Sequence, residues 1–349
     1  MTSSLIQSLV GDPAIEKLFS DEADIRAMLA FEAGLAGAEA DTGVISRKAA
    51  QAIEAACGNF VPDMAALKAG MARDGVVVPS LVTALRKAAG DEHGKSLHLG
   101  ATSQDAIDTS LMLRLKEVCV GLDARLAQAM TALDNLRERS KVTTLMAHTR
   151  MQQAIPFTAS DKIETWERPL KRHRARLREM GPRLLVVQFG GPVGTRGELG
   201  GKGDAVAECL AERLNLGVAP AWHTARDTIA EFGGWLSLVS GTLGKIGADV
   251  ALMAQNEIGA VRLEGGGRSS AMPHKSNPVV AEILMTLALF NATLVGGLHQ
   301  SLIHENERSG SAWTLEWMVL PQMVIATAAG LNHVTALLDD MEFKPASKG

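Results

Sequence analysis

The sequence predicts an all-α fold built as a bundle of long helices, and three observations lead to this prediction. Apolar residues step alternately by three and four positions over 229–253, which is the repeat of a long packed helix. Shorter runs with the same spacing lie within 107–122 and 163–177. No convincing run of alternating strand segments occurs in the chain. Helices much longer than the usual ~12 residues pack side by side, nearly parallel or antiparallel.

Taken in order, the chain divides into a domain of shorter helices and a central bundle. Residues 1–97 are the expected N-terminal helical domain, because turn signals interrupt it at Gly11-Asp12-Pro13, Asp41-Thr42-Gly43 and Gly90-Asp91. Residues 98–340 are the expected bundle, with long helices over about 104–138 and 159–179 and the strongest periodicity over 226–263. A further helix is expected to begin at Pro278, with Asn277 as its cap.

The apolar seam at 229–253 carries two further expectations. Glycines between its apolar positions weaken an isolated helix, but in a tight bundle they let neighbouring backbones come close. The seam is also too long and too apolar for the surface of a monomer, and exposed apolar patches of this kind usually mark interfaces. We therefore expect the seam to lie between the subunits of a homotetramer.

Composition excludes several classes of protein. The chain has 349 residues, an apolar content of 46% and a net charge of −4, which allow a sizeable core and argue against a generally basic nucleic-acid binder. Its three cysteines are far apart and no HExxH pair occurs, so neither a disulfide framework nor a metal site is expected. The start lacks the pattern of a signal peptide, and no apolar run approaches the length of a membrane span. We expect a soluble, cytoplasmic protein that needs no metal or organic cofactor and binds neither nucleic acid nor membrane.

Three polar stretches at the ends of long predicted helices are the candidates for chemistry. They are "HLGATSQDAIDT" (98–109), "AHTRMQQAIP" (147–156) and "GGGRSSAMPHKSNP" (265–278). Hydroxyls, a lysine and an asparagine beside a helix N-terminus can bind an anion. The free backbone N–H groups and the positive end of the helix dipole attract negative charge to the same place. The glycine-rich segment 189–204 fits neither a P-loop nor a clean GxGxxG motif. Bundled helices would bring such ends together within one chain or across subunits.

"SSAMPHKSNP" resembles the signature loop of the fumarase/aspartase superfamily, and "TSQD" and "HTRMQQAIP" fall in the order of its other two blocks. "RLLVVQFGGPVGT", "WHTARDTIAEF" and "NERSGSAWTLEW" are similar to the muconate-lactonizing cycloisomerases of that superfamily. The resemblance implies a homotetramer with active sites built from three subunits. It also implies a small anionic tricarboxylate substrate, 3-carboxy-cis,cis-muconate, which would be converted to 4-carboxymuconolactone in protocatechuate degradation.

The chain departs from the superfamily pattern at three points. Arg268 precedes the serine pair where glycine is usual, and the small C-terminal helical domain of many relatives is expected to be missing or much reduced. In the middle block Arg150 stands where relatives have a histidine, and His148 falls two residues earlier. A lyase that expels hydroxide or an amine needs a general acid there, whereas a carboxylate leaving group needs no proton. This departure favours the lactonizing reaction.

The resemblance and the helix-end positions imply a role for residues of each block. Ser269 matches the catalytic serine of the superfamily and would donate the proton that reaches carbon. Lys275 and Asn277 would stabilise the negative charge that forms on the carbon next to a carboxylate. His98 matches a frequent superfamily histidine that orients a carboxylate or relays a proton, and a structural role is the alternative. Hydrogen bonds to the substrate carboxylates are expected from Thr102, Ser103, Thr149 and Gln152, and ionic contacts from Arg226 and Arg308.

Three other functions remain open from the sequence. An adenylosuccinate lyase-like C–N lyase shares the Thr-Ser and signature blocks but needs a nucleotide phosphate site and a general acid. A cycloisomerase acting on a sulfonated muconate cannot be separated by sequence. A non-catalytic scaffold is the third, and the intact Ser269, Lys275 and Asn277 argue against it.

Overall fold

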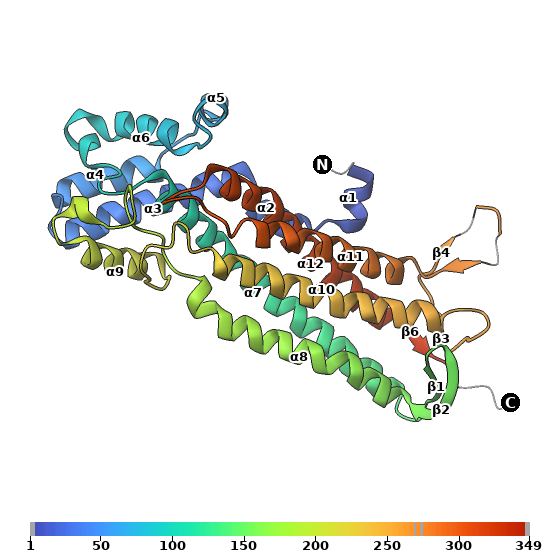
Figure 1. Cartoon of the computed structure of the whole chain (residues 1–349). Helices are drawn as coiled ribbons and strands as arrows, with labels where there is room; N and C mark the ends of the chain where they lie inside the picture. Colours follow the sequence, from blue (N-terminus) through green and yellow to red (C-terminus); the bar gives the residue numbers. More distant parts are fainter. Residues whose placement is uncertain (1–3, 269, 273–274, 346–349) are drawn as a thin grey trace.

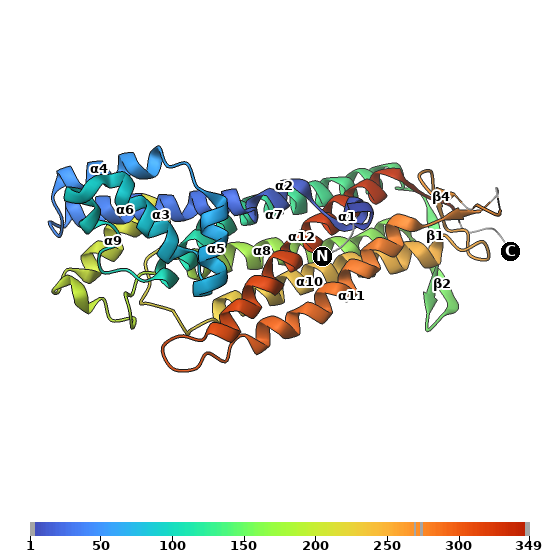
Figure 2. The same ribbon diagram turned by 90° about the horizontal axis from the view of Figure 1, so that it is seen from above.

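The computed structural model describes residues 4–268, 270–272 and 275–345, and within them it contains twelve α-helices and six short strands. The long helices run side by side along the molecule, and most of the shorter helices gather at one end (Figures 1 and 2). The predicted all-α bundle of long helices is therefore confirmed.

Five long helices build the bundle, and their starts follow from the sequence. Thr158 caps α8 by accepting a 3.0 Å hydrogen bond from the backbone N–H of Asp161, and Ser309 caps α12 in the same manner. The helices predicted over 104–138 and 159–179 are both present, and the second extends to Leu184. The long helices are α7 (Ser103–Arg139), α8 (Ala159–Leu184), α10 (Asp227–Met253), α11 (Val279–Gln300) and α12 (Gly310–Asp340).

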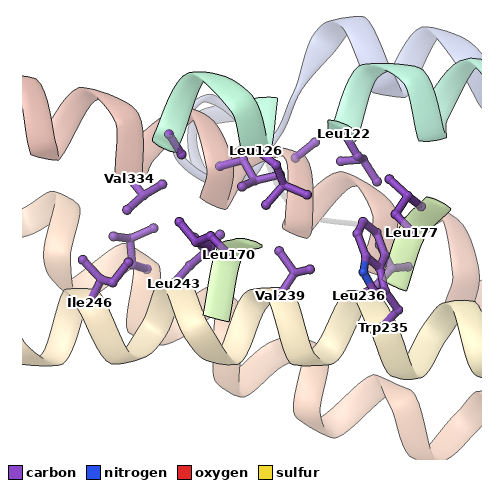
Figure 3. Close-up of a cluster of buried hydrophobic side chains, with 14 of the residues drawn as sticks. Leu122, Leu126, Leu170, Leu177, Trp235, Leu236, Val239, Leu243, Ile246 and Val334 are labelled. Carbon is purple, nitrogen blue, oxygen red and sulfur yellow. The ribbon is translucent and has the colours of Figure 1, made fainter. Parts of the chain in front are cut away.

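Apolar side chains of α7, α8, α10 and α12 meet along the centre of the bundle (Figure 3). Those in Figure 3 include Leu122, Leu126, Leu170, Leu177, Leu236, Val239, Leu243, Ile246 and Val334, all of them buried. The apolar seam of α10 therefore lies inside the chain, and the expectation that it forms an interface between subunits is wrong. The seam is apolar because it packs on other helices of its own chain, among them α8, α11 and α12.

Two glycines of α10 allow α11 to pack closely against it. A Cβ atom on Gly247 would lie 2.5 Å from the carbonyl oxygen of Ala281, and one on Gly244 would overlap the Cβ of Ala288. The expected close approach of backbones is confirmed at these positions. Gly241, on the exposed side of α10, has open space around it and shows no such requirement.

The outer face of α11 carries an uncovered apolar stripe. Met285, Leu289, Ala292 and Gly296 are all exposed, and they step by four, three and four as in a helix–helix seam. By length and composition, three helices of the described chain (α10, α11 and α12) would be able to cross a membrane, which corrects the expectation that no apolar run reaches that length. Only 22% of the apolar window of α11 is buried inside the chain, against 61% for α12, so α11 is the helix with an unpartnered apolar face.

The shorter helices form a second apolar core at one end of the bundle. This core contains side chains of α3, α4, α6 and α9, together with Phe189 and Trp313 from outside the first 97 residues. The domain boundary at residue 97 stays a prediction. The elements at this end are α3 (Asp21–Asp41), α4 (Arg47–Gly58), α5 (Met64–Asp74), α6 (Val78–His93), η1 (Gly94–Ser96), η2 (Gly197–Leu199) and α9 (Gly203–Leu214). The first two helices, α1 (Ser4–Val10) and α2 (Pro13–Leu18), instead lie along the side of the bundle and contact α12 (Figure 1).

Three small antiparallel pairs of strands lie at the opposite end of the bundle (Figure 1). The hairpin of β1 (Thr144–Thr149) and β2 (Gln152–Thr158) was not expected from the sequence, which showed no convincing strand pattern there. The pairing is irregular between Met146 and His148, so the run of residues that alternate between the two faces is short. The other pairs are β3 (Val261–Leu263) with β6 (Met341–Phe343), and β4 (Gly267–Arg268) with β5 (Ser276–Asn277).

Candidate active site

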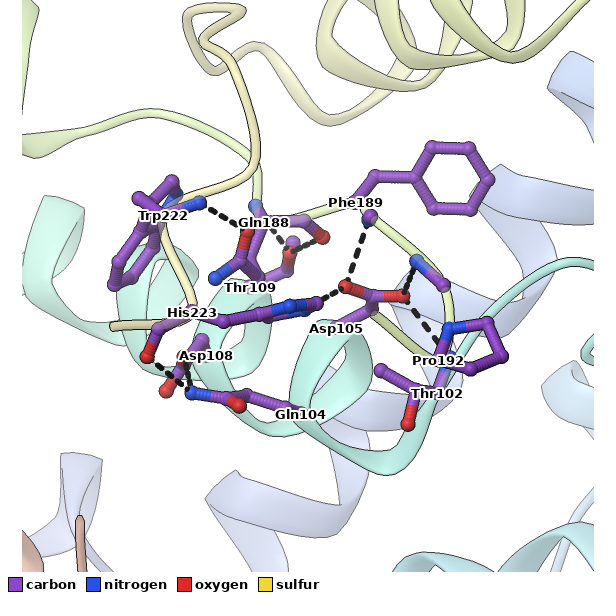
Figure 4. A network of polar contacts seen from close by, with 12 residues as sticks. Thr102, Gln104, Asp105, Asp108, Thr109, Gln188, Phe189, Pro192, Trp222 and His223 are labelled. Atoms are coloured by element: carbon purple, nitrogen blue, oxygen red, sulfur yellow. Dashed lines mark hydrogen bonds and ion pairs between the residues drawn. The ribbon is translucent and has the colours of Figure 1, made fainter. Parts of the chain in front are cut away.

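The first polar block lies at the N-terminus of α7, and the buried carboxylate of Asp105 holds it in place (Figure 4). Asp105 accepts hydrogen bonds of 2.9 Å from the backbone N–H groups of Thr102, Gly190 and Gly191, and its Oδ1 lies 2.8 Å from His223 Nε2. One side chain therefore fixes the Thr102 turn, the glycine loop and a histidine. Sequence reasoning gave Asp105 no role, although an acid three residues after Thr102 is the pattern of a capping box.

Arg308 reaches this block from the loop before α12, and its predicted contact with a substrate stays a prediction. Its Nε donates a 2.9 Å hydrogen bond to Oε1 of Gln104, and its Nη2 donates a 3.2 Å bond to the carbonyl of Pro192. The residue is exposed, so part of its guanidinium group remains open to solvent beside Thr102 and Gln104. A cation in this position is suited to bind an anionic ligand.

Arg226 lies buried against the same block, bound to Asp108, and its expected contact with a substrate carboxylate does not fit its surroundings. Its side chain is fully buried and donates to both carboxylates of Asp108 and Glu316. It also lies over the ring of Trp222, 4.7 Å from the ring centroid. Burial raises the pKa of Glu316, while the charge of Arg226 opposes that rise. We therefore do not expect Arg226 to contact a substrate carboxylate, because Asp108 and Glu316 already bind its guanidinium group.

His98 begins the first block and is anchored from α3. Its Nδ1 lies 2.6 Å from Oε1 of Glu32, a carboxylate that is 1% exposed. The backbone of His98 has a φ of 64°, in the left-handed region that non-glycine residues rarely adopt. Sequence reasoning missed Glu32. The available signal was the apolar seam of α3, in which Met28, Glu32, Leu35 and Glu39 step by four, three and four.

The middle block forms the tip of the β1–β2 hairpin. Thr149 pairs with Gln152 across a two-residue turn, and Arg150 and Met151 both have positive φ, at 49° and 67°. This is the geometry of a type I′ hairpin turn. Thr149, Arg150 and Gln152 are exposed, and the hairpin extends beyond the ends of the long helices (Figure 2). Their polar groups are therefore available to a ligand or to another chain.

The signature block lies at the same end of the molecule, between α10 and α11. Lys275 is exposed, and it lines a groove together with Asn277, Glu282 and Arg262. Asn277 pairs with Gly267 in β4–β5, and Pro278 takes the cap position of α11 without a side-chain hydrogen bond. The expectation that Asn277 caps this helix is corrected, because its backbone belongs to a strand pair. Ser269 lies outside the described residues.

The three blocks do not meet within one chain. Helix α7 separates the first block from the other two, and its 37 residues correspond to a length of about 55 Å. His98, Thr102 and Ser103 lie at the start of α7, where Arg308 contacts Gln104. Thr149 and Gln152 belong to the β1–β2 hairpin and Asn277 pairs with β4, and these strands lie at the other end of the bundle, as does the Lys275 segment beside them (Figure 1). One chain thus presents two separate sets of polar groups.

Comparison with known proteins agrees with this architecture. A family model described as Lyase matches residues 10–294, which is most of the chain. The chain belongs to the fumarase/aspartase superfamily.

Superfamily members with a named activity are similar over nearly the full chain. The 3-carboxy-cis,cis-muconate cycloisomerase of Pseudomonas aeruginosa is 43% identical over 93% of this chain and 72% of its own length. The protein of the same name from Bradyrhizobium diazoefficiens is 38% identical over 99% of this chain and 78% of its own. The crystal structure of the 3-carboxy-cis,cis-muconate lactonizing enzyme from Pseudomonas putida matches with a TM-score of 0.91 at 38% identity, covering 98% of this chain and 78% of the other.

Proposed function

We propose that the protein is a cycloisomerase that converts 3-carboxy-cis,cis-muconate to 4-carboxymuconolactone, as a step of protocatechuate degradation. The similarity at 38–43% identity to relatives of that name, over 93–99% of the chain, is the observation that carries the proposal. The positions of the polar groups add chemical support.

The proposed reaction is an intramolecular addition. One carboxylate oxygen of the substrate attacks an alkene carbon, a C–O bond forms, and the π electrons move to the carbon next to another carboxylate. Lys275 and Asn277 stabilise the charge that develops there, which is the largest catalytic effect we expect. A proton, donated by Ser269, then adds to that carbon.

The remaining polar groups hold the substrate carboxylates. Thr102 and Ser103 stand half-buried at the start of α7, and Arg308 adds a positive charge beside them. Thr149 and Gln152 offer exposed polar side chains at the hairpin tip. Arg226 is left out of the proposed binding site, because its guanidinium group is bound by Asp108 and Glu316.

The proposal includes a homotetramer in which different copies complete each active site. The separation of the first block from the other two by α7 supports it, because a single chain cannot bring these groups to one substrate. The exposed stripe on α11 supports it as well, since a second helix with the same spacing would cover it. We propose that copies of this chain cover the stripe in a soluble, cytoplasmic enzyme.

Absorbance spectroscopy tests the function directly. Cyclisation removes the conjugated diene, so purified protein should cause the ultraviolet absorbance of 3-carboxymuconate to fall, and Lys275→Met protein should not. The sulfonated muconate and adenylosuccinate serve as competing substrates in the same assay. Turnover of adenylosuccinate without loss of the muconate signal would replace the proposed reaction with a C–N elimination. Light scattering that gave a monomer at micromolar concentration would remove the shared-site arrangement.

A further inference from the structure

A buried ion pair links the N-terminal helices to the first block of the proposed site. His98 Nδ1 and Glu32 Oε1 are 2.6 Å apart, and the two residues are 66 positions apart in sequence. Glu32 is 1% exposed and the side chain of His98 is 12% exposed. The contact therefore lies under the surface, while part of the imidazole still reaches it.

The contact fixes the orientation of the ring as well as its charge. The backbone of His98 is held in a left-handed conformation, and the preceding carbonyl of Leu97 accepts a 3.1 Å hydrogen bond from Arg86. Nδ1 is occupied by Glu32, and Nε2 has no hydrogen-bond partner among the residues that the structure describes. Nε2 is therefore the ring atom that remains for a ligand.

The surroundings of the imidazole favour its protonated form. Burial lowers the pKa of His98, but the charge and hydrogen bond of Glu32 outweigh it, so the pKa lies above its ordinary value. Asp105 on α7 also raises this pKa, and Arg86 on α6 lowers it. Glu39, two turns along α3, does not add a second negative charge. Burial and the charge of Glu32 raise the pKa of Glu39 to about 9, so this acid is neutral near pH 7.

We propose that Glu32 is a positioning residue that keeps His98 oriented and positively charged, so that Nε2–H of the imidazolium binds a substrate carboxylate at the first block. This inference rests on the proposed function for the identity of the anion. It distinguishes the two roles that the sequence left open for His98. His98 contacts the ligand, and Glu32 has the structural role of holding the imidazole ring.

The first test needs no substrate. The His98 ring is titrated by NMR in the wild type, in Glu32→Gln and in Glu39→Gln. The Glu39 variant is a matched control, because it alters a buried acid of the same helix that is already neutral. We expect Glu32→Gln to lower the pKa of His98 by about one unit or more, and Glu39→Gln to leave it within about 0.3 units. A wild-type His98 that titrates below its ordinary value would overturn the proposal without any variant being needed.

The second test asks whether the charge serves the substrate. For 3-carboxymuconate, Glu32→Gln should raise KM about tenfold at about pH 7.5, with a smaller change in kcat, because a ground-state ionic contact is lost. In the pH profile of kcat/KM, the apparent pKa of the high-pH limb should fall by the same amount as the pKa of His98 measured by NMR. Glu32→Asp, which keeps the charge, should recover part of both effects. An unchanged pH profile in Glu32→Gln would show that the pair is only structural. If the pKa of His98 is raised but the protein does not turn over muconate, the proposed substrate is refuted. The ion pair between Glu32 and His98 would still be supported.

Discussion

Lys275 is exposed in the groove at the end of α10 and α11, three residues before the cap of α11. A cation at this point stabilises charge that exists only while the C–O bond forms. Lys275→Met should therefore lower kcat by about 10²-fold or more, with little change in substrate affinity. Steady-state kinetics and calorimetric binding measure the two effects, and circular dichroism should show unchanged helical content. Near-normal turnover would mean that the lysine is only a surface residue.

Arg150 occupies the turn of the hairpin, at the position where relatives that need a general acid have histidine. A carboxylate that adds or leaves requires no proton, so Arg150→His should bring no gain in rate. It should also add no titration at about pH 6 to 7 to the profile of kcat. Ser269→Ala is the contrasting variant, and it should abolish turnover while the substrate still binds. A large gain in Arg150→His with a new acidic limb would instead favour an elimination with a poor leaving group.

Glu39 makes the stability of the fold depend on pH. Its carboxyl group is buried without a hydrogen-bond partner among the described residues, and its pKa is raised to about 9. The folded state then holds a proton that the unfolded chain has released, so stability should fall as pH rises between about 4.5 and about 9. The slope should reach about 1.4 kcal/mol per pH unit. Urea unfolding across this range should show that Glu39→Gln loses this decline. Parallel curves for both proteins would contradict the prediction.

Side-chain roles were predictable from the sequence only where the partner is near in sequence or the motif is shared with relatives. Arg308 lies beside the first block, and its contact with a substrate stays a prediction. The buried pairing of Arg226 was not predictable, because its partners Asp108 and Glu316 are 118 and 90 positions away and no local pattern reveals such a pairing. Glu32 is hidden for the same reason, since its partner His98 lies on another element.

At the scale of elements, the contact of α10 with α11 depends on small residues. In Gly247→Ala the new methyl group would meet the Ala281 carbonyl, so the helices must separate, at a cost of about 1 to 3 kcal/mol. Gly241→Ala is the matched control on the same helix. It meets open space and should be neutral or stabilise by up to about 1 kcal/mol through helix propensity. Urea unfolding compares the two, and equal destabilisation would rule out close packing as the cause.

The long helices were predictable because each repeats its apolar spacing over many turns. The hairpin was not, since its alternation is short, irregular and mostly exposed. The role of the α10 seam was also beyond the sequence. A run of apolar residues shows that a surface is covered, but it cannot show whether the covering helix belongs to the same chain. The structure assigns the seam to the core and shows the uncovered stripe on α11 instead.

At the scale of the whole molecule, complementation tests the composite site. His98→Gln damages one end of each chain, and Lys275→Met damages the other. If a site takes its first block from one copy and its signature block from another, mixed oligomers contain some sites with both blocks intact. Unfolding and refolding the two inactive proteins together should therefore restore activity well above that of either protein refolded alone. No recovery, with mixed oligomers present by mass spectrometry, would place all the groups of a site in one chain.

The length of α7 has a consequence for how activity relates to gene dose. In the proposed shared-site arrangement, each chain carries two incomplete halves about 55 Å apart, so an isolated chain would have no complete catalytic site. Below the concentration at which copies associate, doubling the number of chains should more than double the rate of turnover. Above that concentration the rate should become proportional to chain number. A cell that makes only a few copies of this protein would then gain almost no turnover from them, and activity would appear only above a threshold of expression.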